Sequence, residues 1–408
     1  MNVKEVLHVV GVSGSYNKDM VAIRSGAVAD GFVYRGSPVT PGFRKIVQPG
    51  AEVSIMLRLE DGQVALGDCT DVIFAGAAGR DRLFIPADHS EFLTAGLPGL
   101  LNGREIDQFR PLAEEIEQTE WHGRRLHTAL RYGISQALLH AAALARRVPM
   151  ARIICDEYDC TAATAPLPML VSSPTNDWLQ LDQRILKQVA LLPHSSFTQV
   201  ERHIGLRGEK LIEYARTVVR RIGEIGEPGY EPTIHLDVYG TLGELFANDV
   251  ERIADYLGEL KAAVGRHPLM VEAPIIADTL AGQIELYGKL YKAVRRKGHG
   301  TQIIVDEWCN TLEDVRAFTD AGAVDLLQIK TPDLGGIGNT IEAVLYARRN
   351  GLGVSLGGSL NETDQSARVT AHVGVACNPT YIYAKPGPGG DGGLMIMANE
   401  VLRTLVLM

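Results

Sequence analysis

Cysteine pairs, long hydrophobic runs and an excess of positive charge are all missing from this sequence. Its five cysteines are odd in number and irregularly spaced, so they predict no disulfide framework. Cys155 and Cys160 form a C-x4-C pattern without a second ligand pair, which disfavours a zinc site. No apolar stretch approaches the roughly 20 residues that a membrane crossing needs. The first residues carry neither a basic leader nor a small-residue cleavage site, and these absences together predict a cytoplasmic protein with reduced thiols.

The acidic charge balance narrows the classes of partner. Lysine and arginine number 40 against 49 aspartates and glutamates, which gives a net charge of −9. A surface of this sign argues against nucleic acid or an anionic membrane as the main partner. It leaves an anionic small-molecule substrate open, because the local positive charge of a bound metal outweighs a diffuse field. At 408 residues the chain is too long for one core of ordinary size and predicts two domains.

The pattern of residues 1–160 is typical of an α+β domain. A polar connection is expected from residue 21, and the glycines of 75–81 predict a loop. Alternating and helical spacing of apolar residues predicts three strands and one long amphipathic helix. The strands are predicted at 3–12, 51–59 and 63–68, with a hairpin turn at 60–62 between the last two. The helix is predicted at 128–147.

From about residue 165 onward, short apolar runs alternate with amphipathic segments. The eight strand candidates occupy 166–172, 189–193, 233–237, 269–272, 302–306, 326–330, 353–359 and 380–384. The helices predicted between and after them span 208–222, 242–263, 280–297, 312–321, 341–349 and 396–406. Repeated strand–helix steps of this kind predict a (β/α)8-type barrel. An open doubly wound sheet is the alternative architecture.

Four of these apolar runs end in charged residues. Asp237, Glu272 and Asp306 close three successive runs, at intervals of 35 (272 − 237) and 34 (306 − 272) residues. Lys330 closes the next run, 24 residues later (330 − 306). A strand–helix–strand step takes about 30 residues or more. Since the carboxyl ends of parallel strands face one mouth of a barrel, we expect these four side chains to converge there.

Three converging carboxylates predict a site for a hard divalent cation. Oxygen ligands suit Mg²⁺ or Mn²⁺, and Mg²⁺ leaves room for substrate oxygens. A hydrophobic residue precedes each acid, so none belongs to a solvated charge run. For any single acid, capping of the following helix or pairing with a surface base is the simpler interpretation. The matched spacing of all three favours the metal site.

Two basic residues are candidates for proton transfer. Lys330 is expected to have a lowered pKa, because burial and a neighbouring cation both disfavour the ammonium form. Such a lysine can remove a proton next to a carboxylate when a metal stabilises the enolate-like product. His194 ends a run one strand before that of Asp237, which in a closed barrel places it across the mouth from Lys330. An exposed loop lysine and a structural histidine are the alternative interpretations.

Several strings along the chain form one pattern. They are GAAGRDRLF (76–84), RYGISQALL (131–139), LPH (192–194), HLDVYG (235–240), VEAP (271–274), VDEW (305–308), QIKTPDLGG (328–336), GG (357–358), NET (361–363) and AKPG (384–387). With these strings the sequence resembles the enolase superfamily and, within it, the methylaspartate ammonia-lyases. QIKTPD after three spaced acids is the most specific part. The muconate-cycloisomerase pattern fits less well, because no K-x-K precedes Asp237.

The resemblance implies an enolase-like architecture, with an α+β capping domain over 1–160 on a modified TIM barrel over 161–408. It implies Mg²⁺ on the three acids, with Mn²⁺ as a substitute, K⁺ as an additional cation, and a homodimer. Lys330 would remove the C3 proton of 3-methylaspartate, and His194 would serve the opposite epimer or bind a carboxylate. Gln328 would hydrogen-bond the carboxylate that the metal polarises. Loss of ammonia from C2 would then give mesaconate.

Five positions depart from the family pattern where the other end of the substrate is expected. The family has glutamine in place of Ile73 and Ser172, threonine–cysteine in place of Ser359 and Leu360, and leucine in place of Tyr383. Each lost polar contact is typically worth about 1–3 kcal/mol where it is desolvated. The departures therefore predict an altered substrate pocket beside intact metal and base machinery.

The leading hypothesis is a Mg²⁺-dependent carbon–nitrogen lyase of the methylaspartate ammonia-lyase type, acting on a small amino-dicarboxylate. A second hypothesis keeps the proton abstraction but assigns a different carboxylate substrate, as for a dehydratase, racemase or other lyase. A third is a non-catalytic metal-binding scaffold. It is disfavoured because such a set of acids and bases is not needed for folding.

Overall fold

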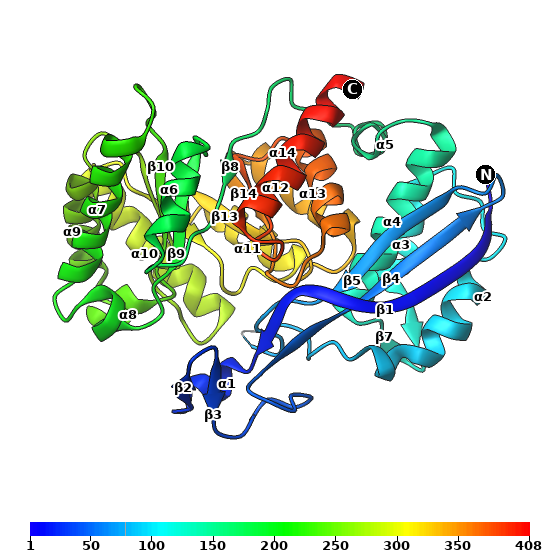
Figure 1. Cartoon of the computed structure of the whole chain (residues 1–408), viewed down its shortest axis with the longest axis horizontal. Coiled ribbons are helices and arrows are strands. Elements are labelled where there is room, and N and C mark those ends of the chain that lie inside the picture. Colours follow the sequence, from blue (N-terminus) through cyan, green and yellow to red (C-terminus); the bar gives the residue numbers. More distant parts are fainter. Residues whose placement is uncertain (78) are drawn as a thin grey trace.

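Eight parallel strands close into a barrel in the computed structural model, which describes residues 1–77 and 79–408 (Figure 1). The closed ring confirms the predicted barrel and excludes an open sheet. Around the ring the order is β10, β11, β12, β13, β14, β15, β8 and β9. The strands are β8 (Met169–Leu170), β9 (Leu191–Ser196), β10 (Thr233–Asp237), β11 (Leu269–Glu272), β12 (Gln302–Val305), β13 (Leu326–Lys330), β14 (Gly353–Gly357) and β15 (Tyr381–Tyr383).

The strands follow the predicted apolar runs, because both faces of a parallel barrel sheet are buried. β8 is the shortest and falls inside the predicted 166–172 run, where Pro166 and Pro168 cannot donate to a ladder. β9 instead continues beyond its predicted end, so that His194 lies inside the strand. Inward side chains fill the barrel interior: Leu170, Leu191, Met270, Ile304, Leu326, Tyr381 and Tyr383.

Helices surround the barrel, and two of them, α10 and α11, have the predicted bounds. The predicted 242–263 helix is wrong as one element, because Ala247 and Asn248 adopt positive φ and Asp249 caps a new helix start. The last predicted helix, 396–406, begins earlier in the structure, at Gly390. The helices are α6 (Trp178–Leu186), α7 (Glu209–Ile225), α8 (Thr241–Leu245), α9 (Val250–Val264), α10 (Leu280–Lys297), α11 (Leu312–Ala321), α12 (Ile337–Arg349), α13 (Asp364–Cys377) and α14 (Gly390–Leu407), with a π-turn at Val200–Ile204.

The N-terminal part is built on an antiparallel sheet of β1 (Val3–Lys18), β4 (Val47–Leu59) and β5 (Val64–Thr70). β1 is longer than predicted, and residues 20–24 form a helix rather than a connection because Asp19 caps it through the N–H of Ala22. The division into domains near residue 160 stays a prediction. The other elements are α1 (Met20–Arg24), β2 (Val28–Asp30), β3 (Val33–Arg35), α2 (Leu97–Leu101), α3 (Phe109–Gln118), β6 (Glu120–Trp121), β7 (Arg124–Arg125), α4 (Thr128–Arg146) and α5 (Met150–Tyr158), with short turns at Pro86–His89 and Phe92–Gly96.

Helix α4 packs directly on β5, and Figure 1 shows the two side by side. Gly133 allows this approach, because a Cβ there would overlap Cys69 of β5. The N-terminal part also reaches the barrel mouth, where the Ile73 N–H donates to Ser359 Oγ at 2.9 Å. The predicted 75–81 loop lies beside this contact, with residue 78 outside the described residues. Among the residues that the structure describes, no helix has the length and hydrophobicity for crossing a membrane.

Candidate active site

The three acids meet at the carboxyl ends of adjacent barrel strands. Asp237 ends β10, Glu272 ends β11 and Asp306 directly follows β12. Asp237 and Glu272 are paired in register across the two strands. All three are buried, with exposed fractions of 1%, 1% and 4%. The structure therefore brings together the residues that the spacing singled out.

The charges of these acids oppose one another. Burial raises the pKa of Asp237 well above its usual range, and the neighbouring Asp306 raises it further. Burial likewise raises the pKa of Glu272, with Asp237 and Asp306 adding to the effect. Glu272 Oε2 accepts no hydrogen bond from the described residues, although His235 Nε2 lies 3.3 Å away. An orphaned oxygen among mutually repelling carboxylates fits a divalent cation, which would supply the missing positive charge.

Lys330 reaches this cluster from the end of β13. Its Nζ contacts both carboxylate oxygens of Asp306 at 2.5 Å. Burial alone would lower the pKa of Lys330, but the charge of Asp306 raises it above its usual range. The sequence-based expectation that Lys330 has a lowered pKa is therefore wrong when only residues of the chain act on this lysine. A lowered pKa requires a cation that takes up the charge of Asp306.

His194 lies on the opposite side of the mouth. β9 and β13 are four positions apart in the eight-strand ring. Its Nε2 is 3.8 Å from Asp237 Oδ2 and its Nδ1 is 3.8 Å from Glu272 Oε2. Burial, together with the charge of Lys330, lowers the pKa of His194 to about 3, so the imidazole is neutral at ordinary pH. The acids thus lie between two basic side chains.

The backbone at His194 is unusual and explains how the ring is aimed. His194 and Ser195 have φ values of 61° and 45°, a left-handed conformation that costs energy for residues other than glycine. The register with β10 shifts here, because His194 pairs with Leu236 while Ser196 pairs with Asp237. This is a β-bulge, a feature that redirects a side chain next to a site. The bulge directs His194 toward the acids.

One cavity connects these groups with most of the predicted substrate positions. Its volume is about 540 Å³ when the open space at the mouth is included. It is lined by Val72, Ile73, Phe74, Arg80, His194, Ser196, Asp237, Tyr239, Glu272, Asp306, Gln328, Lys330, Gly358, Ser359, Leu360, Tyr383 and Pro386. Ser172 is not among the lining residues and instead hydrogen-bonds with Tyr383. Gln328 is 1% exposed, and its Oε1 has no hydrogen-bond partner among the described residues, so one end of the amide remains free for a ligand.

Arg80 is a lining residue to which sequence reasoning gave no role. Its Nη1 donates to Glu307 Oε2 and its Nε to Asp333 Oδ2, both at 2.9 Å. Although burial would raise the pKa of Glu307, Arg80 and then Lys330 hold it at about 2. Arg80 therefore joins the N-terminal part to the loops after β12 and β13. The GAAGRDRLF string contained this arginine, but its partners are more than 220 residues away in the chain.

A closed parallel barrel with an N-terminal α+β part, which carries the acids and the two basic side chains at its mouth, has the enolase-like fold that the sequence predicts. The fold is shared with a muconate lactonizing enzyme from Pseudomonas fluorescens, at 17% identity and a TM-score of 0.64 over 95% of this chain and 88% of the other. Two family models, for the N-terminus and the C-terminus of methylaspartate ammonia-lyase, match residues 1–159 and 161–408. The chain belongs to the methylaspartate ammonia-lyase family, whose members are carbon–nitrogen lyases.

Individual relatives match along the whole chain. Methylaspartate ammonia-lyase 1 of Carboxydothermus hydrogenoformans is 45% identical, over 100% of this chain and 97% of its own. A magnesium complex of β-methylaspartase from Clostridium tetanomorphum has a TM-score of 0.95 at 43% identity, covering 100% of this chain and 99% of the other. The Citrobacter amalonaticus enzyme containing (2S,3S)-3-methylaspartic acid has a TM-score of 0.97 at 43% identity, with the same coverage.

Proposed function

We propose that this lyase is a Mg²⁺-dependent methylaspartate ammonia-lyase that eliminates ammonia from 3-methylaspartate, or a closely related amino diacid, to give mesaconate or its analogue. The observation that carries the proposal is the placement of Lys330 and His194 on opposite sides of three buried acids. A proton beside a carboxylate is weakly acidic, so its removal needs both a positioned base and nearby positive charge. The cavity offers the base, and a metal ion held by the three acids would supply the charge.

Asp237, Glu272 and Asp306 would hold the Mg²⁺, with Mn²⁺ as a substitute of similar ligand preference. When bound, the ion supplies Lewis-acid stabilisation of the negative charge that develops on the substrate carboxylate. The magnesium complex of the clostridial relative supports this assignment. The orphaned Glu272 oxygen and the raised pKa values of Asp237 and Glu272 support it from this chain's own side.

The basic residues act on the proton at C3. Lys330 takes this proton from one face, and the electron pair then expels the amine from C2. His194 faces the substrate from the other side, where it serves the opposite epimer or binds a carboxylate. Gln328 lines the cavity, and its amide N–H would donate to the carboxylate beside C3. Proton transfer of this kind typically contributes about 10²–10⁴-fold in rate.

The rest of the cavity wall selects the substrate. Ile73, Ser359, Leu360 and Tyr383 line it, and Ser172 acts through its hydrogen bond with Tyr383. Ile73 contributes an aliphatic side chain, and its N–H is already engaged by Ser359. This apolar wall favours a second candidate function, the same proton abstraction on a less polar carboxylate. Family membership leaves a non-catalytic scaffold without support.

Three further features follow from the family resemblance. The enzyme uses K⁺ as an additional cation, forms a homodimer and works in the cytoplasm. The unpaired state of all five cysteines supports a reducing compartment. Sedimentation velocity tests the dimer, and activity in K⁺ against tetramethylammonium buffers tests the monovalent cation. A monomer at micromolar concentration, or equal rates in the two buffers, would contradict the respective proposal.

The decisive experiment is an assay of 3-methylaspartate with Mg²⁺ that follows both ammonia and the unsaturated diacid. Equal amounts of the two products are expected, and chelation of the metal should abolish both. Each epimer is then assayed with Lys330→Ala and His194→Ala. Activity that persists when both bases are removed would reject these base assignments. Efficient turnover of another carboxylate alone would favour the second candidate.

A further inference from the structure

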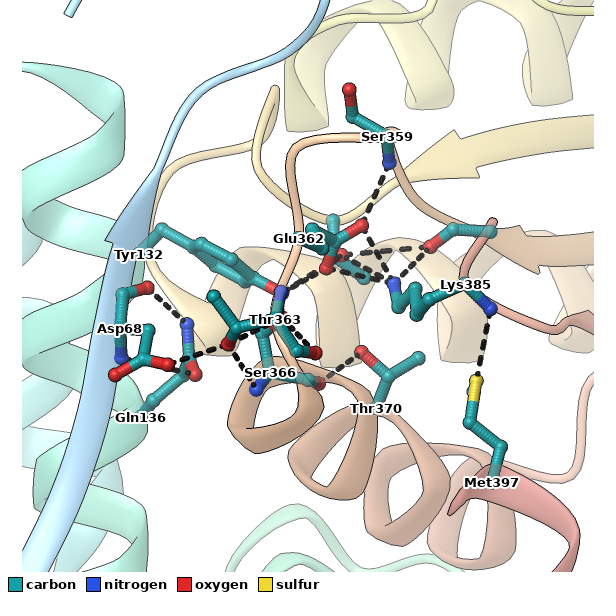
Figure 2. Close-up of polar contacts among 12 residues, drawn as sticks. Asp68, Tyr132, Gln136, Ser359, Glu362, Thr363, Ser366, Thr370, Lys385 and Met397 are labelled. Carbon is teal, nitrogen blue, oxygen red and sulfur yellow. Dashed lines mark hydrogen bonds and ion pairs between the residues drawn. The ribbon is translucent and has the colours of Figure 1, made fainter. Parts of the chain in front are cut away.

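A fully buried ion pair lies next to the cavity and has no role in the chemistry described above. Lys385 follows β15 and Glu362 lies between β14 and α13. Both side chains are 0% exposed, and Lys385 Nζ is 2.8 Å from Glu362 Oε2. Figure 2 shows Lys385 and Tyr132 approaching Glu362 from opposite sides. An ion pair with no access to water needs a reason, because removing two charges from water is costly.

Lys385 joins the ends of two barrel strands. Besides Glu362, its Nζ donates to the carbonyl of Gly357 at 3.0 Å and to Thr331 Oγ1 at 3.2 Å. The three contacts match the three donors of an ammonium group. Thr331 directly follows Lys330, and Gly357 is the register partner of Lys330 in the neighbouring strand. Lys385 therefore contacts both the residue that follows the proposed base and the strand that lies beside it.

Glu362 holds the substrate-facing loop and the N-terminal part. Its Oε2 accepts the N–H of Ser359 at 2.7 Å. Its Oε1 accepts the Tyr132 hydroxyl at 2.5 Å and Thr331 Oγ1 at 3.0 Å. Tyr132 belongs to α4, and Ser359 in turn accepts the N–H of Ile73. In Figure 2 the Ser359 side chain points away from Glu362 and Lys385, whereas its backbone N–H points toward them.

The backbone at Gly358 lies between the Glu362–Lys385 pair and the cavity. Gly358 lines the cavity, and a Cβ at this position would overlap both Glu362 Oε2 and Lys385 Nζ. The charged atoms of Glu362 and Lys385 therefore lie against Gly358 on the side opposite the cavity. A shift of the pair would move Gly358 and the residues on either side of it.

We propose that Glu362 and Lys385 are a positioning pair, which fixes the 357–360 loop and the end of β13 so that substrate and Lys330 meet in reactive geometry. The inference deepens the proposed function and rests on it. Neither residue is among those that line the cavity, so both act through Ser359, Gly358 and Thr331. Small misplacements near reacting atoms are costly, because rate depends steeply on the approach of the base to the proton.

The test uses the full-length Lys385→Met/Glu362→Gln double variant. Removing both charges together leaves no unpaired buried ion, and such replacements are tolerated in folding far better than single ones. We expect the double variant to fold, to bind Mg²⁺ as the parent does, and to lose about 30-fold in kcat, with a KM rise of about 10-fold. Tyr132→Phe removes one contact to Glu362 and should raise KM about threefold with little change in kcat.

Isotope effects separate positioning from loss of folded protein. Substrate deuterated at C3 should show a larger effect on kcat in the double variant, because proton removal becomes more strongly rate-limiting. A lower folded fraction would reduce kcat without changing KM or the isotope effect. Glu117→Gln is the matched control, since Glu117 pairs with buried Arg131 and accepts the Gly336 N–H but does not line the cavity. It should lower the melting temperature and leave KM and the isotope effect unchanged.

Hydrogen exchange gives a readout that requires no turnover. Amides of 357–363 and 326–332 should exchange at least tenfold faster in the double variant, with little change in α10. If the parent chain lacks lyase activity, the proposed function fails, and exchange alone still decides the positioning inference. Unchanged exchange overturns the inference, as do kinetic constants of the double variant that equal those of the parent.

Discussion

This molecule contains two clusters of buried acids, which differ in their partners. Asp237, Glu272 and Asp306 lie at the barrel mouth, whereas Glu52 and Asp68 are diagonal neighbours on β4 and β5 of the N-terminal sheet. Burial raises the pKa of Glu52 to about 8, with Asp68 adding to the effect. A raised pKa therefore does not by itself mark a functional site.

The difference lies in the partners of the two clusters. Ser54 Oγ lies 2.8 Å from Glu52 Oε1 and 2.9 Å from Asp68 Oδ1, and Thr363 Oγ1 donates to Asp68 Oδ2 at 2.5 Å. At the mouth, Glu272 Oε2 has no hydrogen-bond donor among the described residues and faces a cavity. Hydroxyl groups contact the sheet acids, whereas at the mouth Lys330 pairs with Asp306 and leaves Glu272 Oε2 without a donor among the described residues. Four substitutions test this contrast.

Removal of the proposed base should have the largest effect. Lys330→Ala is expected to lower kcat about 10³-fold for the epimer whose proton faces Lys330, as loss of a general base typically does. Steady-state kinetics on both methylaspartate epimers measure the loss. Lys330→Arg is the matched control, because arginine keeps the positive charge beside Asp306 yet cannot accept a proton at ordinary pH. Full activity in the arginine variant would contradict the base assignment.

Glu272→Gln should separate activity from stability. We expect kcat/KM to fall about 10²-fold at a fixed low Mg²⁺ concentration, because one of three anionic ligands is lost. In chelator, the melting temperature should rise, because the repulsion with Asp237 and Asp306 is relieved. Calorimetric titration with Mg²⁺ and thermal denaturation measure the two effects. Unchanged Mg²⁺ affinity would remove Glu272 from the metal site.

The mouth acids could be predicted from sequence for a physical reason. Each ends an apolar run, and a barrel sends the ends of its strands to one side, so local pattern was enough to place them. Lys330 and His194 followed from the same rule. The closed barrel and the bounds of α10 and α11 were likewise accessible, because strand and helix periodicity are local properties.

Other features depended on contacts between distant segments. Arg80 pairs with Glu307 and Asp333, but the sequence around residue 80 does not indicate these partners. Lys385 is buried, but the string that contains it is rich in proline and glycine and gives no sign of this burial. The raised pKa of Lys330 arises from the orientation of Asp306, which spacing does not specify. Sequence therefore located the charges, and tertiary structure determined their partners.

Ile73→Gln should change binding more than chemistry. The cavity wall at this position is aliphatic, and an amide there can hydrogen-bond a polar substrate group. One such bond is worth about 1–3 kcal/mol, so KM for 3-methylaspartate should fall about tenfold while kcat stays within about twofold. Steady-state kinetics on 3-methylaspartate and on analogues with a substituent on the amine provide the measurement. Ile73→Leu is the control of similar size without the amide, and an equal KM change in both variants would reject the role of hydrogen bonding.

Glu52→Gln should leave catalysis unchanged and alter only the pH dependence of stability. The folded pKa of Glu52 lies near 8, above the usual value of 4.5. The folded chain therefore holds this proton more tightly than the unfolded chain, and the stability that it gives is complete below pH 4.5 and is lost as pH rises toward 8. Glutamine removes this loss. We expect a gain of about 1–2 kcal/mol in the free energy of unfolding at pH 8 and little gain at pH 4.5. Urea denaturation at both pH values measures the difference. A gain of equal size at both would show that Glu52 does not carry the proton, and a change in KM or kcat would erase the distinction between the two acid clusters.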